Sequence, residues 1–418
     1  MPSALQVQTL RRVTIDEALD AVAKHPVRQV PSERLRISAS LSGRVTASEI
    51  LAPEDVPPFD RSSVDGFAVL ERDLRAAPPG QPVRLHIAGE VRMGEAPPGP
   101  LASGNAIRVP TGGALPPGAD AVVKIENCRE SNGAVEISGA RGAHDHVTRR
   151  GADVKRGDHL CRCGDILTPA SLGMLAGAGI AEVPVFVRPR VALIVTGDEL
   201  APPGSQMRAG QIRDINWLSL DAALSAIGMA PQFVYVRDDK ASLAQQLRES
   251  LEHGDAVVIS GGSSVGERDY TPAVVAEAGS PGVIVHGVRA RPGRPTMLGI
   301  VDERPVIGLP GNPVSALVMF ELLGRPILQR LFGRSDKVIP VRAKLGAPLE
   351  RDPDLERYVA VRLKMGDSGV EAEPLPGSSA QMHILGFADA LVRVPQGSGS
   401  LAKGAPVDAV PLSKNNAL

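Results

Sequence analysis

Two runs of apolar residues that end abruptly in glycine and acidic residues constrain the fold of this chain most. The first is Val191-Ala-Leu-Ile-Val195, followed by Thr196-Gly-Asp-Glu-Leu200. The second is Asp255-Ala-Val-Val-Ile-Ser260, followed by Gly261-Gly-Ser-Ser-Val-Gly-Glu-Arg-Asp269. Short runs of β-branched residues separated by helical stretches are typical of parallel strands buried on both faces. Ligands bind at the carboxyl ends of such strands, so we expect the chemistry where these two runs end.

The residues after these strands favour a phosphorylated ligand held with magnesium. Glycines let backbone N–H groups approach an anion, whereas neighbouring carboxylates would repel that anion unless a divalent cation lay between them. Three acidic clusters share this pattern: Thr196-Gly-Asp-Glu199, Arg237-Asp-Asp239 and Gly266-Glu-Arg-Asp269. On one edge of a sheet they would repel one another by about 3 kcal/mol per close pair at an effective dielectric near 20. The alternative is that each acid merely caps a helix.

Two later turns are suited to binding an oxyanion. Arg291-Pro-Gly-Arg294-Pro presents two guanidinium groups from a stiff turn. Gly308-Leu-Pro-Gly-Asn-Pro-Val-Ser315 predicts a helix that begins at Asn312 with Pro313 in its first turn, so its free N–H groups could also face an anion. A well-made turn without a ligand would use the same residues, and this alternative stays open.

Strand and helix patterns alternate from residue 191 to about 333 and predict a doubly wound parallel sheet. Strands are expected at 191–195, 233–236, 255–260, 283–288 and 305–309, and helices near 216–227, 241–253, 271–278 and 312–332. An earlier helix is predicted after Thr14-Ile-Asp-Glu17, which has a capping-box pattern. The fold class is multidomain α/β plus β, in four predicted domains: a discontinuous N-terminal helical and linker domain (8–36 and 151–188), a β-rich domain (37–150), the α/β domain (189–333) and a small C-terminal β-barrel-like domain (334–418).

Composition excludes several classes of function. The formal charge is −1, and aromatic residues make up 3% of the 418 residues, which argues against a nucleic-acid binder. No segment approaches the roughly 18 apolar residues of a membrane span. Three cysteines fit a reducing compartment, so we expect a cytoplasmic protein without disulfides. Neither a P-loop nor a dinucleotide fingerprint is present.

Two pairs of potential metal ligands and two polar loops precede the α/β region. Cys161-Arg-Cys163 and His144-Asp-His146 lack the second pair that a tetrahedral site needs, so a metal site there is disfavoured. The loops 58–68 and 111–121 concentrate an acid, hydroxyls and glycines, which suits binding but also suits plain turns.

Taken in order, these motifs resemble the molybdopterin molybdenumtransferase family, the MoeA and gephyrin E-domain type. The motifs are Asp60-Arg-Ser-Ser-Val-Asp-Gly66, Thr111-Gly-Gly, Arg149-Arg-Gly-Ala-Asp153, Thr196-Gly-Asp-Glu-Leu200, Arg237-Asp-Asp239, Ser260-Gly-Gly-Ser-Ser-Val-Gly-Glu-Arg-Asp269, Arg291-Pro-Gly-Arg-Pro295 and Gly308-Leu-Pro-Gly-Asn-Pro313. They span nearly the whole chain.

The resemblance implies a function and an assembly. It implies insertion of molybdate into adenylylated molybdopterin, with release of AMP, formation of molybdenum cofactor and a requirement for Mg²⁺. It also implies a molybdopterin-binding-like α/β domain and an elongated, four-domain homodimer. In the family the active site lies between the α/β domain of one subunit and the β-rich domain of the other. The molybdopterin adenylyltransferase is a candidate partner.

Carried over position by position, the resemblance also implies roles for individual residues. Catalytic roles fall to Asp65, Thr111, Glu199, Asp238 and Asp269, and of these Glu199 and Asp269 are the metal ligands. Substrate binding falls to Asp153, Gly261, Gly262, Ser263, Arg291, Arg294, Pro310 and Pro313.

The chain departs from the family pattern where the oxyanion would bind. Arg291 and Arg294 stand where the family usually has lysines, and Thr148 and Ala152 replace a basic residue and a glutamate. A family arginine falls at Ala360, with Arg362 expected to compensate, and the Ser-Ser-Leu segment and the Asn that follows it align with His383-Ile-Leu385 and Asp389. Two alternatives therefore stay open: a non-catalytic pterin-binding carrier or scaffold, and the same chemistry on another oxyanion such as tungstate.

Overall fold

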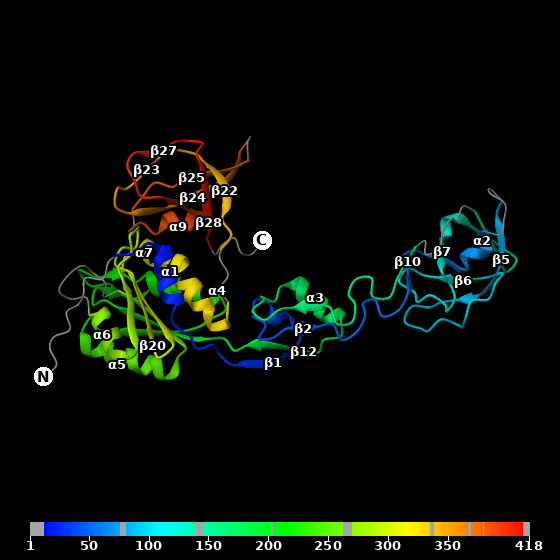
Figure 1. The fold of residues 1–418 in the computed structure, drawn as a ribbon, viewed down its shortest axis with the longest axis horizontal. Coiled ribbons are helices and arrows are strands. Elements are labelled where there is room, and N and C mark those ends of the chain that lie inside the picture. The colour runs from blue at the N-terminus through cyan, green and yellow to red at the C-terminus, as the bar shows by residue number, and fades with distance from the viewer. Residues whose placement is uncertain are drawn as a thin grey trace. The chain divides into compact units, whose positions relative to one another are not determined.

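The computed structural model describes residues 12–75, 81–138, 146–201, 204–261, 270–334, 338–366, 369–378 and 380–412. The chain forms two compact units (Figure 1). Residues 34–185 form one unit, and the residues before 34 join those from 186 onward to form the other. Residues 34–185 are therefore inserted in the chain between α1 and the α/β sheet, which both belong to the other unit.

The helix predicted after Thr14 is confirmed. α1 (Ile15–Ala23) is capped by Thr14, whose side chain accepts a hydrogen bond from the Glu17 N–H while the Glu17 carboxylate accepts one from the Thr14 N–H. Ile15, Ala18 and Val22 form its buried face. This face packs against the α/β sheet, because α1 contacts β18 and β20.

The α/β sheet has six strands in the order β16-β13-β17-β21-β20-β18. These strands are β13 (Arg190–Thr196), β16 (Ala230–Val236), β17 (Ala256–Ser260), β18 (Pro281–His286), β20 (Met297–Val301) and β21 (Arg304–Leu309). The first four in spatial order are parallel, as predicted, but β20 pairs antiparallel with both β21 and β18. The sheet is therefore mixed, and β20 is a strand that the sequence analysis did not identify.

Helices lie on both faces of this sheet (Figure 1). They are α4 (Asn216–Ala226), α5 (Lys240–His253), α6 (Thr271–Ala278), α7 (Pro313–Met319) and α8 (Arg325–Gln329). A π-helical turn, η3 (Phe320–Gly324), joins α7 to α8, and η4 (Arg330–Phe332) follows. Leu243, Leu247 and Leu251 of α5 pack with Ile194 and Ile259 of the sheet in one apolar core.

The C-terminal region forms a five-stranded barrel. Its strands are β22 (Val341–Leu345), β24 (Glu356–Gly366), β25 (Gly369–Pro374), β26 (Ala390–Val394) and β28 (Pro406–Pro411), with the short helix α9 (His383–Phe387) and the pair β23 (Leu349–Glu350) and β27 (Ser400–Leu401) beside them. Pairing of β24 with β26 closes the barrel. A short strand of the α/β region, β19 (Ala290–Arg291), adds to β24 in parallel. The two regions thus share one set of strand hydrogen bonds.

The inserted unit is rich in β-structure, as predicted. A six-stranded sheet contains β4 (Gly66–Val69), β5 (Val83–Glu90), β6 (Asn105–Val109), β7 (Ala121–Lys124), β8 (Cys128–Ser131) and β9 (Ala134–Ile137). The unit also contains the strand pairs β3 (Arg61–Ser62) with β10 (Val147–Thr148), β2 (Ile50–Leu51) with β11 (His159–Cys161) and β1 (Ser32–Arg36) with β12 (Glu182–Phe186). Short helical segments complete the unit: η1 (Ala39–Leu41), α2 (Glu71–Arg75), η2 (Ile125–Asn127) and α3 (Pro169–Gly177).

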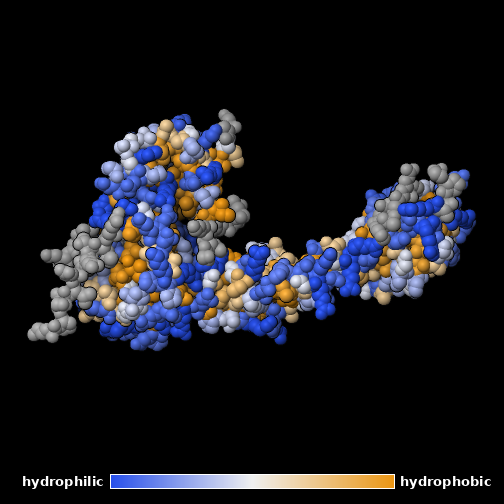
Figure 2. Space-filling model, viewed as in Figure 1, coloured by the Kyte–Doolittle hydropathy of each residue, from blue (hydrophilic) through white to orange (hydrophobic). Residues whose placement is uncertain are grey.

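On the face drawn in Figure 2, hydrophilic residues cover much of the surface and apolar residues lie in patches between them. Within the described ranges, no helix is long and apolar enough to cross a membrane.

Candidate functional site

The carboxyl ends of β13, β17 and β21 meet at one edge of the α/β sheet, where the sequence predicted a ligand site. A single side chain connects them: Nδ2 of Asn216 donates to Oγ of Ser260 at 2.8 Å and to the carbonyl oxygen of Gly311 at 2.8 Å. Asn216 is the first residue of α4 and is buried. It therefore fixes the loop after β13 to the end of β17 and to the turn after β21.

Glycine is required at the end of β17. Gly261 has a φ of +99°, and a Cβ placed there would lie 2.3 Å from the carbonyl oxygen of Thr196. The backbone after β17 thus passes directly against the end of β13. Gly262, Ser263 and Asp269, which follow in the predicted site, lie outside the described residues.

Acidic side chains gather beside the end of β13. Asp238 accepts a hydrogen bond from Oγ1 of Thr196 at 3.2 Å, while Glu199 is exposed in the loop that follows the strand. The hydroxyl of Tyr235 lies 2.5 Å from the carbonyl oxygen of Gly197 and holds the start of that loop. Partial burial, together with the negative charges of Asp214, Glu199 and Asp198, raises the pKa of Tyr235 to about 12.

Asp214 is the most constrained carboxylate of this edge. It is 5% exposed, and its Oδ2 atom is buried without a hydrogen-bond partner among the described residues. Its Oδ1 atom accepts from the Trp217 N–H at 3.3 Å. Burial raises the pKa of Asp214 above its ordinary value, although the N–H groups of Trp217 and Asn216 favour the ionised form. An unsatisfied buried acceptor of this kind costs about 1–3 kcal/mol.

A cavity of about 850 Å³ opens next to the predicted basic turn. One wall comprises the turn residues 291–294 and the start of α7, and the other comprises the C-terminal barrel. Gly293 in the turn has a φ of +109°, and a Cβ there would lie 2.3 Å from Cγ of Met319, so the turn is pressed against α7. α7 begins at Pro313, as predicted, but Asn312 makes no side-chain cap hydrogen bond.

Positive charge dominates the ionisable lining of this cavity, with four arginines against two acids. The arginines are Arg291, Arg294, Arg351 and Arg357, and the acids are Glu350 and Asp352. Arg357 donates to the carbonyl oxygen of Glu350. Within the described part of the chain, no carboxylate pairs with the other three arginines, and Nε of Arg351 is buried without a partner. The cavity is therefore suited to an anion.

Ala360 and Ile384, where the chain departs from the family pattern, both line the cavity. Arg362, which was expected to compensate for Ala360, does not line this cavity. Its guanidinium instead lies over the ring of Phe387, 5.9 Å from the ring centre. Arg351, which the sequence analysis did not single out, supplies cationic lining.

In the inserted unit, the loop before β4 brings Asp65 to Thr111. Oδ1 of Asp65 accepts hydrogen bonds from the backbone N–H of Thr111 at 2.7 Å and from its hydroxyl at 3.1 Å. Pairing of Gly66 with Val109 explains this contact, since it places the residues just before β4 beside those just after β6. Two of the five residues to which the resemblance gave catalytic roles are thus in direct contact.

Arginines follow β10 in the same unit and hold two neighbouring aspartates. Asp60 pairs with Arg149 and accepts from the N–H of Arg150 at 2.8 Å; Asp55 accepts from Nε of Arg150 at 2.5 Å. Burial would raise the pKa of Asp60, but the hydrogen bonds from Arg150 and Arg149 hold it below its ordinary value. Asp153 is exposed, and its backbone N–H donates to the Val56 carbonyl at 3.0 Å.

Comparison with known proteins assigns the chain to a family. Three family profiles match in order: the MoeA N-terminal region (domain I and II) at residues 13–179, a probable molybdopterin binding domain at 192–330, and the MoeA C-terminal region (domain IV) at 342–412. A Mycobacterium tuberculosis protein named molybdopterin molybdenumtransferase 2 is 34% identical over 367 residues, covering 87% of this chain and 91% of that protein. This chain belongs to the MoeA family.

Other MoeA relatives agree. A Methanocaldococcus jannaschii protein named as a putative molybdopterin biosynthesis protein is 34% identical over 384 residues, covering 87% of this chain and 88% of its own length. The crystal structure of a molybdopterin biosynthesis MoeA protein from Pyrococcus horikoshii superimposes with a TM-score of 0.81 at 36% identity, over 96% of this chain and 99% of that one. The resemblance drawn from the sequence motifs is confirmed at the level of family and fold.

The structure groups the predicted MoeA site residues into local sets. Glu199, Asp238 and Gly261 lie at the ends of β13, β16 and β17; Pro310 is buried directly after β21, and Pro313 starts α7. Arg291 and Arg294 line the cavity, and Asp65 contacts Thr111. Asp214 and Asn216 were not predicted, although the segment Ile212-Arg-Asp-Ile-Asn216 just before a helix could have indicated them, since acidic and amide residues are common at helix starts.

Proposed function

We propose that this protein is a molybdopterin molybdenumtransferase, which inserts molybdate into adenylylated molybdopterin and releases AMP. The observation that carries the proposal is the arginine-lined cavity of about 850 Å³ beside the Arg291 turn, in a chain of the MoeA family. A dianionic oxyanion matches guanidinium donors that lack a carboxylate partner. Relatives named molybdopterin molybdenumtransferase cover this chain over most of its length.

In this proposal the arginines of the cavity bind and orient molybdate. Arg291 and Arg294 project from a turn whose backbone is fixed by α7 and β24, so little backbone freedom is lost when the anion binds. Arg351 adds a donor from the barrel wall. Ala360 and Ile384 make part of the cavity wall apolar, so the bound anion has fewer hydrogen-bond donors on that side.

The glycine and carboxylate edge of the sheet binds the pterin nucleotide. The backbone at Gly261 and the turn at Pro310 and Pro313 offer close approach to its phosphates. The family motif assigns Gly262 and Ser263 to substrate binding as well. Asn216 keeps the three loops in one arrangement while the ligand enters and leaves. Asp238 has a catalytic role next to Thr196 in this edge.

Magnesium belongs to this proposal, with Glu199 and Asp269 as its ligands. Within the described residues, no group of three or more His, Cys, Asp or Glu side chains is placed to hold a metal ion, and Asp269 lies outside those residues. Carboxylate oxygens such as those of Glu199 and Asp198 are nonetheless the donors that magnesium prefers. Bound magnesium would supply charge neutralisation for the diphosphate of the substrate.

The inserted unit contributes Asp65, which Thr111 holds in one orientation through two hydrogen bonds. We assign Asp65 and Thr111 to catalysis and Asp153 to substrate binding. A homodimer, a cytoplasmic location and delivery of the substrate by the molybdopterin adenylyltransferase complete the proposal. Sedimentation of the purified chain at micromolar concentration tests the dimer.

The decisive experiment measures AMP released from adenylylated molybdopterin by the purified protein and magnesium, with molybdate, with tungstate and without either. Molybdate-dependent release supports the transferase. Release with tungstate alone assigns the same chemistry to another oxyanion, an outcome that Ala360 and Ile384 make worth testing. Tight binding of the pterin nucleotide without release under any condition overturns the transferase in favour of a carrier.

A further inference from the structure

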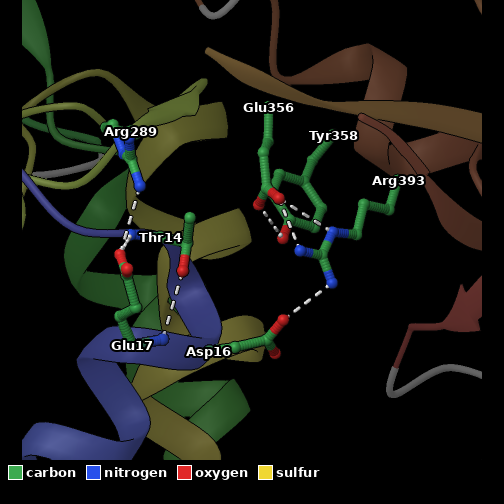
Figure 3. A network of polar contacts seen from close by, with 7 residues as sticks. All are labelled: Thr14, Asp16, Glu17, Arg289, Glu356, Tyr358 and Arg393. Carbon is green, nitrogen blue, oxygen red and sulfur yellow. Dashed lines mark hydrogen bonds and ion pairs between the residues drawn. The ribbon is translucent and has the colours of Figure 1, made fainter. Parts of the chain in front are cut away.

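The first turn of α1 holds together the basic turn and the C-terminal barrel through a network of polar contacts (Figure 3). Asp16 accepts a hydrogen bond from Nη1 of Arg393 at 2.9 Å, and Glu17 accepts one from Nη2 of Arg289 at 3.3 Å. Arg393 also donates from Nε to Glu356 at 3.2 Å and pairs with it through Nη2. We call Asp16, Glu17, Arg289, Glu356 and Arg393 the α1 clasp.

The α1 clasp is directly connected to the cavity through Glu356. Its backbone N–H donates to the carbonyl oxygen of Arg289 at 2.9 Å, and β24 pairs there with β19, so that Glu356 lies opposite Ala290 and Arg357 opposite Arg291. The Glu356 carboxylate is buried, accepts from the Tyr358 hydroxyl at 3.2 Å and pairs with Arg393. Arg393 thus neutralises the carboxylate of Glu356. The backbone of Glu356 in turn holds β19, the strand that ends at Arg291.

Burial makes this arrangement sensitive to the loss of Arg393. Burial would lower the pKa of Arg393, but its hydrogen bond to Glu356 and the surrounding negative charges hold it above its ordinary value. Removal of the guanidinium would leave the buried Glu356 carboxylate with only the Tyr358 hydroxyl as a side-chain donor among the described residues. A buried carboxylate that loses its cation draws in water or moves toward it. We expect either response to shift β24 where it pairs with β19.

We propose that Arg393, acting through Glu356, is a positioning residue that fixes Arg291 in the anion cavity. Arg393 does not line the cavity itself, so it does not touch the anion. The inference rests on the proposed function for its kinetic consequence. Its structural consequence, an ordered Arg291 turn, is independent of the reaction.

The kinetic test compares Arg393→Met with Arg342→Met in the full-length protein. Arg342 serves as the control because it also pairs with a carboxylate of the barrel, that of Asp408 at 3.0 Å, but it is more exposed and does not line the cavity. We expect Arg393→Met to raise the KM for molybdate roughly tenfold, the equivalent of one charge-assisted hydrogen bond, with kcat changed less than about twofold. Arg393→Lys should recover part of the loss, and Arg342→Met should behave like the wild type.

A double-mutant cycle separates positioning from a general loss of stability. In an Arg291→Ala background, Arg393→Met should change the KM for molybdate by less than about twofold, because the residue that it positions is gone. Additive effects of the two substitutions would overturn the proposal. So would a KM for Arg393→Met equal to that of Arg342→Met.

Hydrogen exchange gives a readout that does not require turnover. The amides of Val288, Thr296 and Glu356 are hydrogen-bonded around the turn. Faster exchange at these amides in Arg393→Met than in Arg342→Met supports the clasp, and equal exchange refutes it. If the wild-type protein releases no AMP with molybdate, the proposed function fails, while the exchange experiment still decides the role of Arg393.

Discussion

Replacement of Asp214 by asparagine should make the protein more stable and less active. The side chain is 5% exposed, and its Oδ2 atom has no hydrogen-bond partner among the described residues, so the folded state carries an unsatisfied charge. Asparagine keeps the shape of the side chain and an oxygen that can accept from the Trp217 N–H, but it removes the charge. A residue retained at such a cost is typical of a ligand site.

The size of the expected gain in stability follows from the burial of Asp214 and from its raised pKa. An unsatisfied buried acceptor costs about 1–3 kcal/mol, and each unit by which the folded-state pKa exceeds the unfolded one costs about 1.4 kcal/mol at high pH. Because the folded pKa of Asp214 lies above the ordinary value of 3.8, the native state is favoured below pH 3.8 and loses stability as pH rises through the folded pKa. The gain from asparagine should therefore grow with pH above 3.8 and then level off.

Thermal unfolding of the wild type and Asp214→Asn between pH 3.5 and 8.5 measures this gain. We expect a Tm increase at pH 8.5 of about 2–4 °C for each kcal/mol, reported by the α/β region. AMP release by the variant should fall at least tenfold if the Asp214 carboxylate supplies a charge to the occupied site. A variant that is less stable than the wild type at every pH, or a gain that does not change with pH, would refute the reasoning from burial; full activity would limit Asp214 to a structural role.

Three further changes test other parts of the molecule. Asp65→Asn should abolish AMP release with little change in Tm. The control is Asp73→Asn, because the Asp73 carboxylate also accepts one hydrogen bond from a hydroxyl and one from a backbone N–H; this variant should keep turnover near the wild-type rate. Equal activities of the two variants would contradict the role of Asp65. Asn216→Ala should lower the free energy of unfolding by about 2–3 kcal/mol in urea titrations, since it removes two hydrogen bonds from a buried site. Burial and the acids nearby raise the pKa of Cys128 to about 11. Iodoacetamide at pH 8 should therefore label the exposed Cys163 much faster than Cys128, which peptide mapping would measure. Labelling of Cys128 first would contradict this order.

The sequence predicted those helices and strands whose ends are set by a few neighbouring residues. The capping box at Thr14, the buried runs that became β13 and β17, and Pro313 at the start of α7 were all identified from a few neighbouring residues. β20 was missed because of its turn. Asp302 and Glu303 join β20 to β21 with φ values of +49° and +65°, and no glycine or asparagine marks this left-handed turn in the sequence.

Long-range contacts were outside the reach of sequence patterns. Asn216 binds residues 44 and 95 positions away, and Arg351 enters the cavity only because the barrel closes over the turn. Among the residues named from the family motifs, Asp65 contacts Thr111, and Arg291 lines the cavity. The roles of these residues and the four predicted domain boundaries stay predictions.

The α1 clasp joins the beginning of the chain to its end, since Asp16 and Arg393 are 377 residues apart. During synthesis α1 leaves the ribosome before β18 and β20, which contact it and follow more than 250 residues later. At about 5–20 residues per second, the helix waits roughly 15–60 s for its partners. This helix therefore reaches its native contacts long after its own synthesis, and a chain cut short before the barrel leaves Asp16 without Arg393.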